Sequence, residues 1–193
     1  MVVIPLTTPL KSDVIKKLAI GDKVSLSGRI ITGRDKVHKY LASGGKSPVE
    51  LAGAVIYHCG PVATPQDDTW RITAAGPTTS MREEPYQADI IQTFRPGAIM
   101  GKGGMGNKTR EAMASCGCVY LHLTGGAAQF YASRITAVED VHLAEFGQVE
   151  AMWIIWVKDL PALVTMDSQG RSLHTEIENN SLARFKQLLD SPI

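Results

Sequence analysis

Two glycine-bearing loops, residues 76–82 and 101–106, carry the side chains of this chain that are best suited to chemistry. The first follows a Gly-Pro bend and offers three hydroxyl groups and one guanidinium: Thr78, Thr79, Ser80 and Arg82. Such donors suit an anion, which accepts hydrogen bonds and pairs with a cation. The second sets Lys102 among four glycines, which let backbone N–H groups approach a ligand closely. One predicted helix joins the loops, so we expect a single anion site.

A third cation, Arg34, lies just before a predicted helix N-terminus, where an anion is also favoured. Each group has a structural explanation as well. A threonine can cap a helix or close the Gly-Pro bend, and an arginine is often a solvated surface charge. Lys102 is harder to explain in this way, because a lysine among glycines has little apolar surface to cover. Taken together, the two cationic loops favour a small-anion site.

Two other kinds of site, a nucleotide-binding P-loop and a zinc site, match the sequence less well than an anion site does. The run GKGGMGNKT invites comparison with the P-loop, but Asn107 separates the glycine from Lys108. One inserted residue turns the following helical positions by about 100°, away from the phosphate. The chain also has cysteines and histidines that zinc could use, but without the usual ligand spacing: Cys59, Cys116, Cys118, His58 and His122. We interpret the cysteines as buried thiols and expect no metal bound by this chain.

Length and composition limit the class of protein. A chain of 193 residues fits one domain, residues 1–193, and can bury a real core. The net charge of +1 gives no field that attracts nucleic acid or an anionic membrane. No apolar run has the length of a membrane span, and the first ten residues lack the basic start of a signal peptide. Three cysteines are too few for a disulfide framework. We therefore expect a soluble, cytoplasmic protein.

Hydrophobic periodicity predicts about eight strands and about five helices. Residues 1–10 are typical of an extended edge segment, and the further predicted strands are residues 23–31, 54–57, 70–74, 98–100, 118–123, 135–143, 151–157 and 162–166. Helices are predicted for residues 12–18, from Asp35 to Gly44, from Glu84 through Phe94, and for residues 108–115, 127–132 and 181–189. We expect strands 54–57 and 70–74 to form a hairpin and 151–157 to be buried on both faces. The interpretation is one α/β domain with a mixed sheet and helices packed on it.

Four sequence blocks resemble a known family in their order along the chain. They are Thr32-Gly33-Arg34-Asp35 with His38-Lys39, then AGPTTSMR at 75–82, GKGGM at 101–105 and GGAA at 125–128. This order is similar to that in the β subunit, or C-terminal half, of class I fumarases and of the closely similar L-tartrate dehydratases. The resemblance covers nearly the whole chain, and the two central blocks together are its specific part.

The resemblance implies a fold and a set of roles. These hydro-lyases use a 4Fe-4S cluster as a Lewis acid, and their β part is a swivelling β/β/α domain that closes over it. Thr78 resembles the family's catalytic base, while Arg34, Arg82 and Lys102 resemble its carboxylate-binding cations, with Thr79 beside them. Fixed cations suit this chemistry, because negative charge flows into a carboxylate in the transition state. A threonine is a poor base, so Thr78 would need a neighbour such as Lys102 or backbone N–H groups, and Lys102 is therefore counted as catalytic too.

The cysteines of this chain have neither the number nor the spacing to hold such a cluster. In the family those ligands belong to the α part. We therefore expect a β subunit that binds no cofactor itself, acts on a dicarboxylate, and is active only with an α subunit that supplies the cluster, in an α2β2 assembly. Fumarate is the expected substrate because fumarase has the commoner metabolic role; the alternatives are an L-tartrate dehydratase β subunit and a non-catalytic small-anion-binding module.

Overall fold

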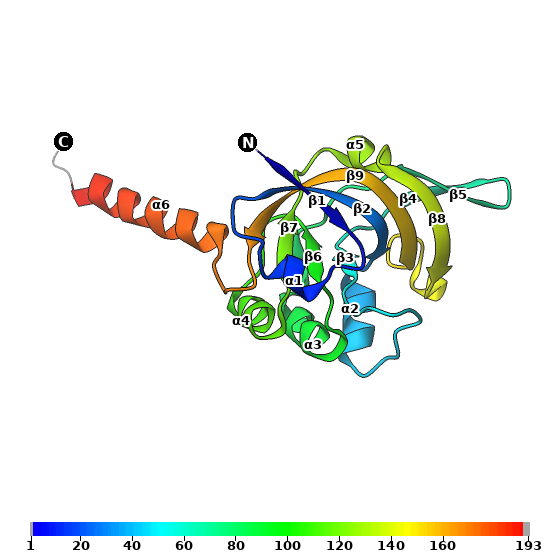
Figure 1. Ribbon diagram of the computed structural model, residues 1–193, viewed down its shortest axis with the longest axis horizontal. Helices are drawn as coiled ribbons and strands as arrows, with labels where there is room; N and C mark the ends of the chain where they lie inside the picture. Colours follow the sequence, from blue (N-terminus) through cyan, green and yellow to red (C-terminus); the bar gives the residue numbers. More distant parts are fainter. Residues whose placement is uncertain (1, 191–193) are drawn as a thin grey trace.

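Five strands form a closed, barrel-like centre in the computed structural model, which describes residues 2–190 (Figure 1). Four of them run parallel in the order β2 (Lys23–Thr32), β3 (Val55–Tyr57), β6 (Ala98–Gly101) and β7 (Val119–His122). The fifth, β9 (Met152–Met166), is antiparallel and pairs with both β7 and β2, which closes the ring. Strands β1 (Val3–Thr7) and β8 (Ile135–His142) extend the sheet from β2 and β9. The predicted mixed sheet is confirmed, including its N-terminal edge strand.

Strand residues alternate between two hydrophobic cores. Ile30 and Ile155 belong to one core with the interior side chains of the barrel, whereas their neighbours Ile31 and Ile154 belong to a second core. The second core lies under α2 (Asp35–Ala42), α3 (Glu84–Phe94) and α4 (Asn107–Cys116), which cover one side of the sheet (Figure 1). Because successive side chains of a strand point to opposite faces, strands buried on both faces are apolar at nearly every position. This explains the run AMWIIWV in β9.

The predicted hairpin between residues 54–57 and 70–74 is wrong. β3 pairs with β2 and β6 in the barrel, and the hairpin is formed by β4 (Val62–Gln66) and β5 (Thr69–Ala74). Its turn is Asp67-Asp68, with Asp67 at a φ of 50°. Aspartate tolerates this left-handed conformation, so the pair can close a two-residue loop. Pro65 fits the arrangement because β4 is an edge strand, in which a missing N–H is tolerated.

The two strands predicted at 151–157 and 162–166 are one continuous strand, β9. The predicted break falls at an irregularity in this strand, where Asp159 has a φ of 50° and Pro161 follows. The pairing of β2 with β9 shifts register opposite this point, between Leu26 and Gly28. A bulge bends a strand without ending it. This bend lets β9 pair with β7 at one end and with β8 at the other.

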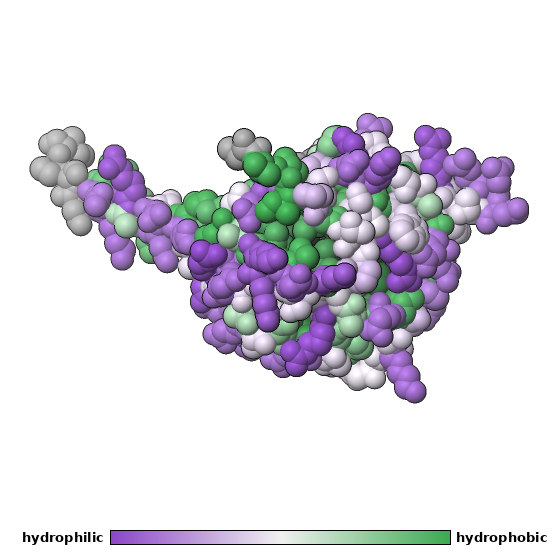
Figure 2. Space-filling model, in the orientation of Figure 1, coloured by the Kyte–Doolittle hydropathy of each residue, from purple (hydrophilic) through white to green (hydrophobic). Residues whose placement is uncertain are grey.

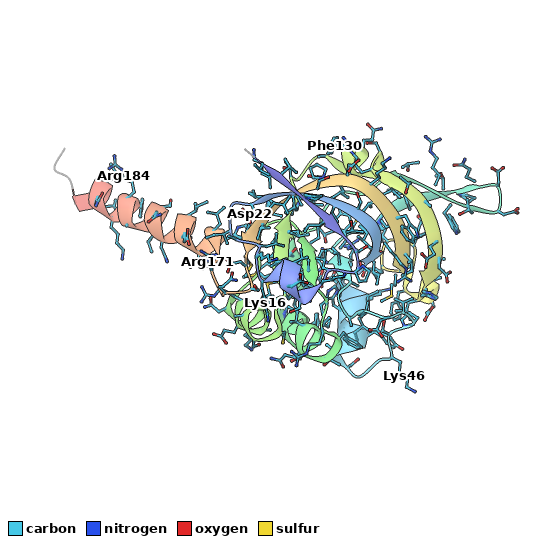
Figure 3. All side chains as sticks on the ribbon, viewed as in Figure 1. Lys16, Asp22, Lys46, Phe130, Arg171 and Arg184 are labelled. Carbon is cyan, nitrogen blue, oxygen red and sulfur yellow. The ribbon has the colours of Figure 1, made fainter. Side chains whose placement is uncertain are left out.

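The C-terminal helix is longer than predicted. Helix α6 spans Leu173–Asp190 and projects away from the barrel (Figure 1), whereas the sequence predicted its start at Ser181. Ser172 precedes it and accepts a hydrogen bond from Thr175 N at 3.4 Å, as an N-cap does. Arg171 at its base pairs with the buried Asp167 at 2.7 Å, while Arg184 lies far out along the helix (Figure 3). Figure 2 shows apolar surface beside β1 and at the base of α6.

The remaining elements are short connections between the strands. They are α1 (Ser12–Ile15), α5 (Ala128–Ala132), and the 3₁₀ turns η1 (Ser80–Glu83) and η2 (Ala144–Phe146). Arg82, predicted to lie in a loop, is part of η1 directly before α3. Among the helices in residues 2–190, none is both long and apolar enough to cross a membrane.

Candidate functional site

The carboxyl ends of four parallel strands meet at one edge of the barrel. These strands end at Thr32, Tyr57, Gly101 and His122, and the next residues of the first three include Arg34, His58 and Lys102. Ligands of α/β sheets commonly bind beyond the carboxyl ends of the strands, where the loops leave the sheet. The blocks singled out in the sequence therefore reach the same edge from different strands.

Thr78 and Lys102 are held side by side by backbone hydrogen bonds. Lys102 N donates to Thr78 O at 3.2 Å, and Ser80 N donates to Lys102 O at 3.0 Å. These bonds form a short parallel bridge between residue 79 and residue 102. The expectation that the two glycine-bearing loops share one place is thus confirmed for their backbones.

The Thr78 hydroxyl has a defined partner. Thr78 Oγ1 donates to His58 O at 2.9 Å, and Thr78 N donates to the same carbonyl at 2.8 Å. A hydroxyl whose proton is held by a carbonyl keeps its lone pairs free to accept hydrogen bonds. Thr79 is exposed at the neighbouring position.

The Lys102 side chain lies over the fourth sequence block. A Cβ placed on Gly125 would stand 3.4 Å from Lys102 Cδ and 3.7 Å from Lys102 Nζ. Gly76, in the first block, is in turn close to Ala128, since a Cβ there would lie 3.1 Å from Ala128 Cβ. The GGAA loop therefore borders the pair formed by Thr78 and Lys102.

Arg34 and Arg82 meet at one carboxylate, that of Asp35. Arg82 Nη2 bonds to Asp35 Oδ2, and Arg34 Nη2 lies 3.8 Å from the same oxygen and 3.4 Å from Glu150 Oε1. Arg34 is mostly buried, with a side chain 18% exposed, whereas that of Arg82 is 55% exposed. The Arg34 guanidinium also lies against Gly60, where a Cβ would be 2.8 Å from Nη1. Arg34 thus borders the segment that follows β3, and Arg82 is joined to Arg34 through Asp35.

A buried polar network, missed in the sequence, lies beneath these loops. Its members come from different elements and are at most 1% exposed: His38, His58, Ser80, Gln87 and Tyr120. His38 could not be identified as a site residue from the sequence, because its partners other than the Arg34 carbonyl lie 20 or more positions away along the chain. Of the five network residues, only Ser80 belongs to a loop that the sequence predicts to bind an anion.

Burial also changes the protonation of this region. Desolvation by burial lowers the pKa of His38 and lowers that of His58 well below its ordinary value. Burial raises the pKa of Glu83 to about 7, with the nearby Asp35 as a further cause. Glu83 is 1% exposed, and neither of its carboxyl oxygens has a hydrogen-bond partner among the described residues. Both imidazoles and this carboxyl therefore favour their uncharged forms.

The P-loop alternative is wrong for a physical reason. Gly106 N and Thr109 Oγ1 both donate to Glu84 Oε2, at 2.8 and 2.7 Å, and Thr109 N donates to Glu84 Oε1 at 3.3 Å. The N-terminus of α4 is therefore capped by a carboxylate of the chain itself. A phosphate would meet that negative charge in the same place.

The cysteines do not fit a metal cluster. Cys59 belongs to the core inside the barrel and Cys118 to the core under the helices, so the sheet separates them. Burial raises the pKa of the Cys59 thiol to about 12 and raises that of Cys118 as well. Within residues 2–190, no group of three or more potential ligands could hold a metal ion. Thiolates are the ligands of iron–sulfur clusters, and these thiols favour the neutral form.

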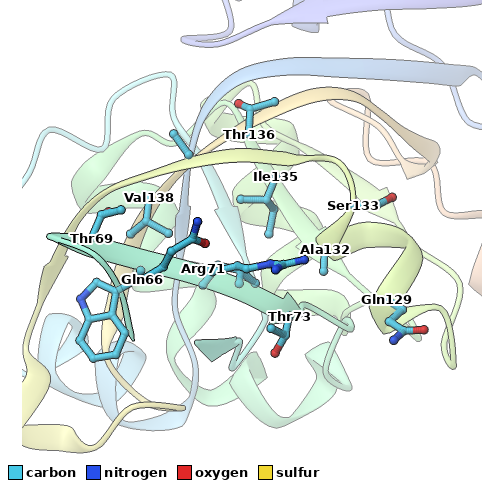
Figure 4. A pocket seen from close by; sticks show the side chains of 13 residues that line it. Gln66, Thr69, Arg71, Thr73, Gln129, Ala132, Ser133, Ile135, Thr136 and Val138 are labelled. Atoms are coloured by element: carbon cyan, nitrogen blue, oxygen red, sulfur yellow. The ribbon is translucent and has the colours of Figure 1, made fainter. Parts of the chain in front are cut away.

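A separate hollow of about 630 Å³ lies between β5, α5 and β8 (Figure 4). Polar side chains and one guanidinium line it, among them Gln66, Arg71, Thr73 and Gln129. It contains none of the sequence-predicted site residues. Among the predicted residues, Thr79 and Arg82 are exposed, whereas Arg34, Thr78 and Lys102 are partly buried.

The fold and this edge define an α/β domain that presents cations and one hydroxyl beyond the ends of parallel strands. A family model described as "Fumarase C-terminus" matches residues 1–177. The chain belongs to this family. It is 54% identical over 186 residues to "Putative fumarate hydratase class I" of Geobacillus stearothermophilus, which covers 96% of this chain but 36% of that relative. It is 34% identical over 173 residues to "L(+)-tartrate dehydratase subunit beta" of Escherichia coli, covering 89% of this chain and 86% of the relative.

Proposed function

We propose that this chain is the β part of a hydro-lyase that hydrates fumarate to L-malate. The observation that carries the proposal is the position of Arg34, Thr78 and Lys102 at one edge of the barrel. Asp35 joins Arg82 to Arg34 at the same edge. The family supports the class of reaction, because its relatives are named as a fumarate hydratase and a tartrate dehydratase subunit. The higher identity to the relative named as a fumarate hydratase favours fumarate.

The cations would bind the two carboxylates of the substrate. Arginine presents two parallel N–H donors to a carboxylate, which fixes its orientation as well as its charge. Addition of water to fumarate places negative charge on a carboxylate in the transition state. Fixed cations stabilise that charge more than the ground state, so Arg34, Arg82 and Lys102 would raise the rate as well as the affinity. Thr79, exposed beside them, is proposed as a further contact.

Thr78 is proposed as the group that exchanges the proton. Its hydroxyl donates to His58 O, so it would act as a base only after that proton is displaced. Lys102 is the proposed activating neighbour, because the backbone bond from Lys102 N to Thr78 O keeps the two residues adjacent. An ammonium beside an alkoxide lowers the cost of forming the anion.

A partner chain is proposed to supply the cluster that the family resemblance implies. Two of the thiols, Cys59 and Cys118, do not fit such a group, since they are buried on opposite faces of the sheet. The chain spans about a third of the length of the Geobacillus relative, and the Escherichia coli relative is named as a subunit. The name of the second relative supports a site completed by another polypeptide, here an α subunit in an α2β2 assembly. The cytoplasmic location stays a prediction.

Mixing the purified chain with its α partner under anaerobic conditions tests this proposal. We expect fumarate hydration from the mixture and none above background from this chain alone, because neither part holds the whole site. Steady-state rates on fumarate and on L-tartrate with the same mixture distinguish the two substrates. Relatives named as tartrate dehydratase β subunits are 34% and 37% identical to this chain, which makes tartrate the second candidate. Turnover of either substrate by this chain alone would contradict the two-part site.

A further inference from the structure

Five buried side chains stand in a line under the edge of the barrel, each within hydrogen-bond distance of the next. From one end, Tyr120 OH lies 2.7 Å from Ser80 Oγ, and Ser80 Oγ lies 2.8 Å from His58 Nδ1. From the other end, His38 Nδ1 lies 2.9 Å from the carbonyl oxygen of Arg34. Gln87 joins the halves, because its Oε1 is 2.9 Å from His58 Nε2 and 3.1 Å from His38 Nε2.

This line connects the two halves of the proposed site. At one end it contacts the carbonyl oxygen of Arg34, the N-cap residue of α2. Towards its other end it includes His58, whose carbonyl accepts both bonds from Thr78. The imidazoles of His38 and His58 pack edge to face with their centroids 4.8 Å apart. A shift of either loop relative to the other must therefore break a bond or a ring contact of this line.

The central amide fixes the direction of the bonds around His58. A carbonyl oxygen only accepts, so His58 Nε2 donates to Gln87 and Nδ1 accepts from Ser80. Tyr120 then donates to the Ser80 oxygen, so the bonds from Tyr120 to Gln87 are complete with His58 neutral. Both ring nitrogens of His38 face carbonyl oxygens, Arg34 O and Gln87 Oε1, so a neutral His38 donates to only one of them. Gln87 Nε2 has no hydrogen-bond partner in the described part of the chain, so the amide is held through its oxygen. One atom, Gln87 Oε1, therefore lies within hydrogen-bond distance of both imidazoles.

We propose that Gln87 is a positioning residue of the dicarboxylate site, which sets the distance between Arg34 and Thr78 through the one carbonyl oxygen that faces both His38 and His58. This inference rests on the proposed function. The amide and both imidazoles are fully buried, so an imidazole N–H that loses its acceptor there cannot form a hydrogen bond to water instead. Loss of the Gln87 oxygen is therefore costly to the arrangement of the rings. Near His38 stand Glu83, Asp35 and Glu150, and near His58 stands His38.

Two substitutions separate positioning from mere packing. Gln87→Met keeps the volume but removes the oxygen that both rings face, so His58 Nε2–H loses its acceptor. It is expected to lower kcat/KM of the assembled enzyme by about 100-fold, as a misplacement of about 1 Å can. Gln87→Glu keeps an acceptor between the rings. It is expected to retain kcat/KM within about 10-fold, because an oxygen still faces both rings.

The imidazoles provide a measurement that does not need enzyme activity. In Gln87→Glu, a carboxylate facing both rings favours their protonated forms, so the pKa of His58 followed by NMR in the isolated chain should rise. In Gln87→Met, the ring signals of His38 and His58 should shift together. Gln92→Met, on the exposed side of the same helix, is the matched control and should leave rates and both signals unchanged.

The outcomes are distinct. Wild-type kcat/KM in folded Gln87→Met overturns the proposal, as does an unchanged pKa of His58 in Gln87→Glu. If Gln87→Met does not fold, the pKa of His58 in Gln87→Glu decides. If the unmodified complex neither hydrates fumarate nor dehydrates tartrate, the proposed function fails, while the NMR signals still show whether Gln87 orders the two rings.

Discussion

Arg34 and Arg82 are paired with carboxylates of the chain itself. Asp35 bonds to Arg82 and lies 3.8 Å from Arg34, which also faces Glu150. A substrate carboxylate would compete with these partners. Arg82 is the more open of the two, with more than half of its side chain exposed, and exposed ion pairs contribute little stability. Exchange of Asp35 for a ligand carboxylate at Arg82 is therefore favourable enough to occur without rearranging the fold.

Glu83 makes the stability of the folded chain depend on pH. Its pKa is raised from 4.5 to about 7 by burial, so between these values the folded chain holds a proton that the unfolded chain has lost. The resulting stabilisation is complete below pH 4.5 and is lost as the pH rises through about 7. Glu83→Gln is uncharged at every pH. At pH 8 we expect the free energy of unfolding of Glu83→Gln to exceed that of wild type by about 1 kcal/mol. We also expect the free energy of unfolding to change less with pH in the variant than in wild type.

Urea unfolding at pH 5 and pH 8 measures this difference. Glu145→Gln is the matched control, because Glu145 is exposed in η2 and should leave the pH dependence unchanged. Equal slopes for Glu83→Gln and wild type between the two pH values would show that Glu83 titrates normally.

The residues that the sequence pointed to are those whose types imply chemistry without knowledge of their neighbours. Arg34, Thr78 and Lys102 could be chosen because cations and hydroxyls in glycine-bearing loops suit an anion. His58 and Gln87 could not, because a buried imidazole is defined by partners that lie 22 and 29 positions away from His58. The catalytic and binding roles of the chosen residues stay predictions.

At the scale of elements, glycine allows β6 to pass close to the first loop. A Cβ on Gly101 would collide with Ser80 Oγ and would lie 3.2 Å from Tyr120 OH and from His58 Cβ. The first loop can lie against β6 only because that Cβ is missing. The same approach allows the backbone bonds between the loop and Lys102.

Gly101→Ala should therefore destabilise the fold by about 1–3 kcal/mol, as other insertions into packed regions do. Thermal or urea unfolding measures the loss. Gly125→Ala is the control, because the nearest atom to its Cβ is Lys102 Cδ at 3.4 Å, an ordinary contact, and its backbone needs no positive φ. Equal stability of the two variants would mean that Ser80 can move aside, and would remove the structural reason for a glycine at position 101.

Element type was more predictable than pairing. The helix that begins at Glu84 was predicted at that residue because Pro85 marks the first turn. The partner of β3 was not predictable, since Val55–Tyr57 is three apolar residues that fit a hairpin or a barrel equally well. The bulge at Asp159 looked like the end of a strand because proline and a left-handed residue are common in turns. Closure of the barrel depends on contacts that no short window of sequence contains.

At the scale of the whole molecule, the proposed site lies at one end of the barrel. Loops from β2, β3 and β6 gather there, while α2, α3 and α4 cover the neighbouring face of the sheet (Figure 1). The predicted α/β class and mixed sheet are confirmed; the swivelling motion and the single-domain assignment stay predictions. The hollow between β5 and β8 is a separate feature (Figure 4). Thr79 and Arg82 are exposed at the proposed site, which suits a site that a second polypeptide completes.

Titration of the isotope-labelled chain with L-malate, followed by the backbone amide signals, tests most directly whether one dicarboxylate contacts all the proposed loops. The account predicts that signals of Arg34, Thr78, Arg82 and Lys102 shift together with a single Kd in the millimolar range, about −4 kcal/mol of binding free energy. Signals of the β4–β5 hairpin should stay fixed, and Arg82→Ala should weaken all the shifts in parallel. Shifts that occur in only one loop, that follow different binding constants, or that appear elsewhere in the chain would contradict the account.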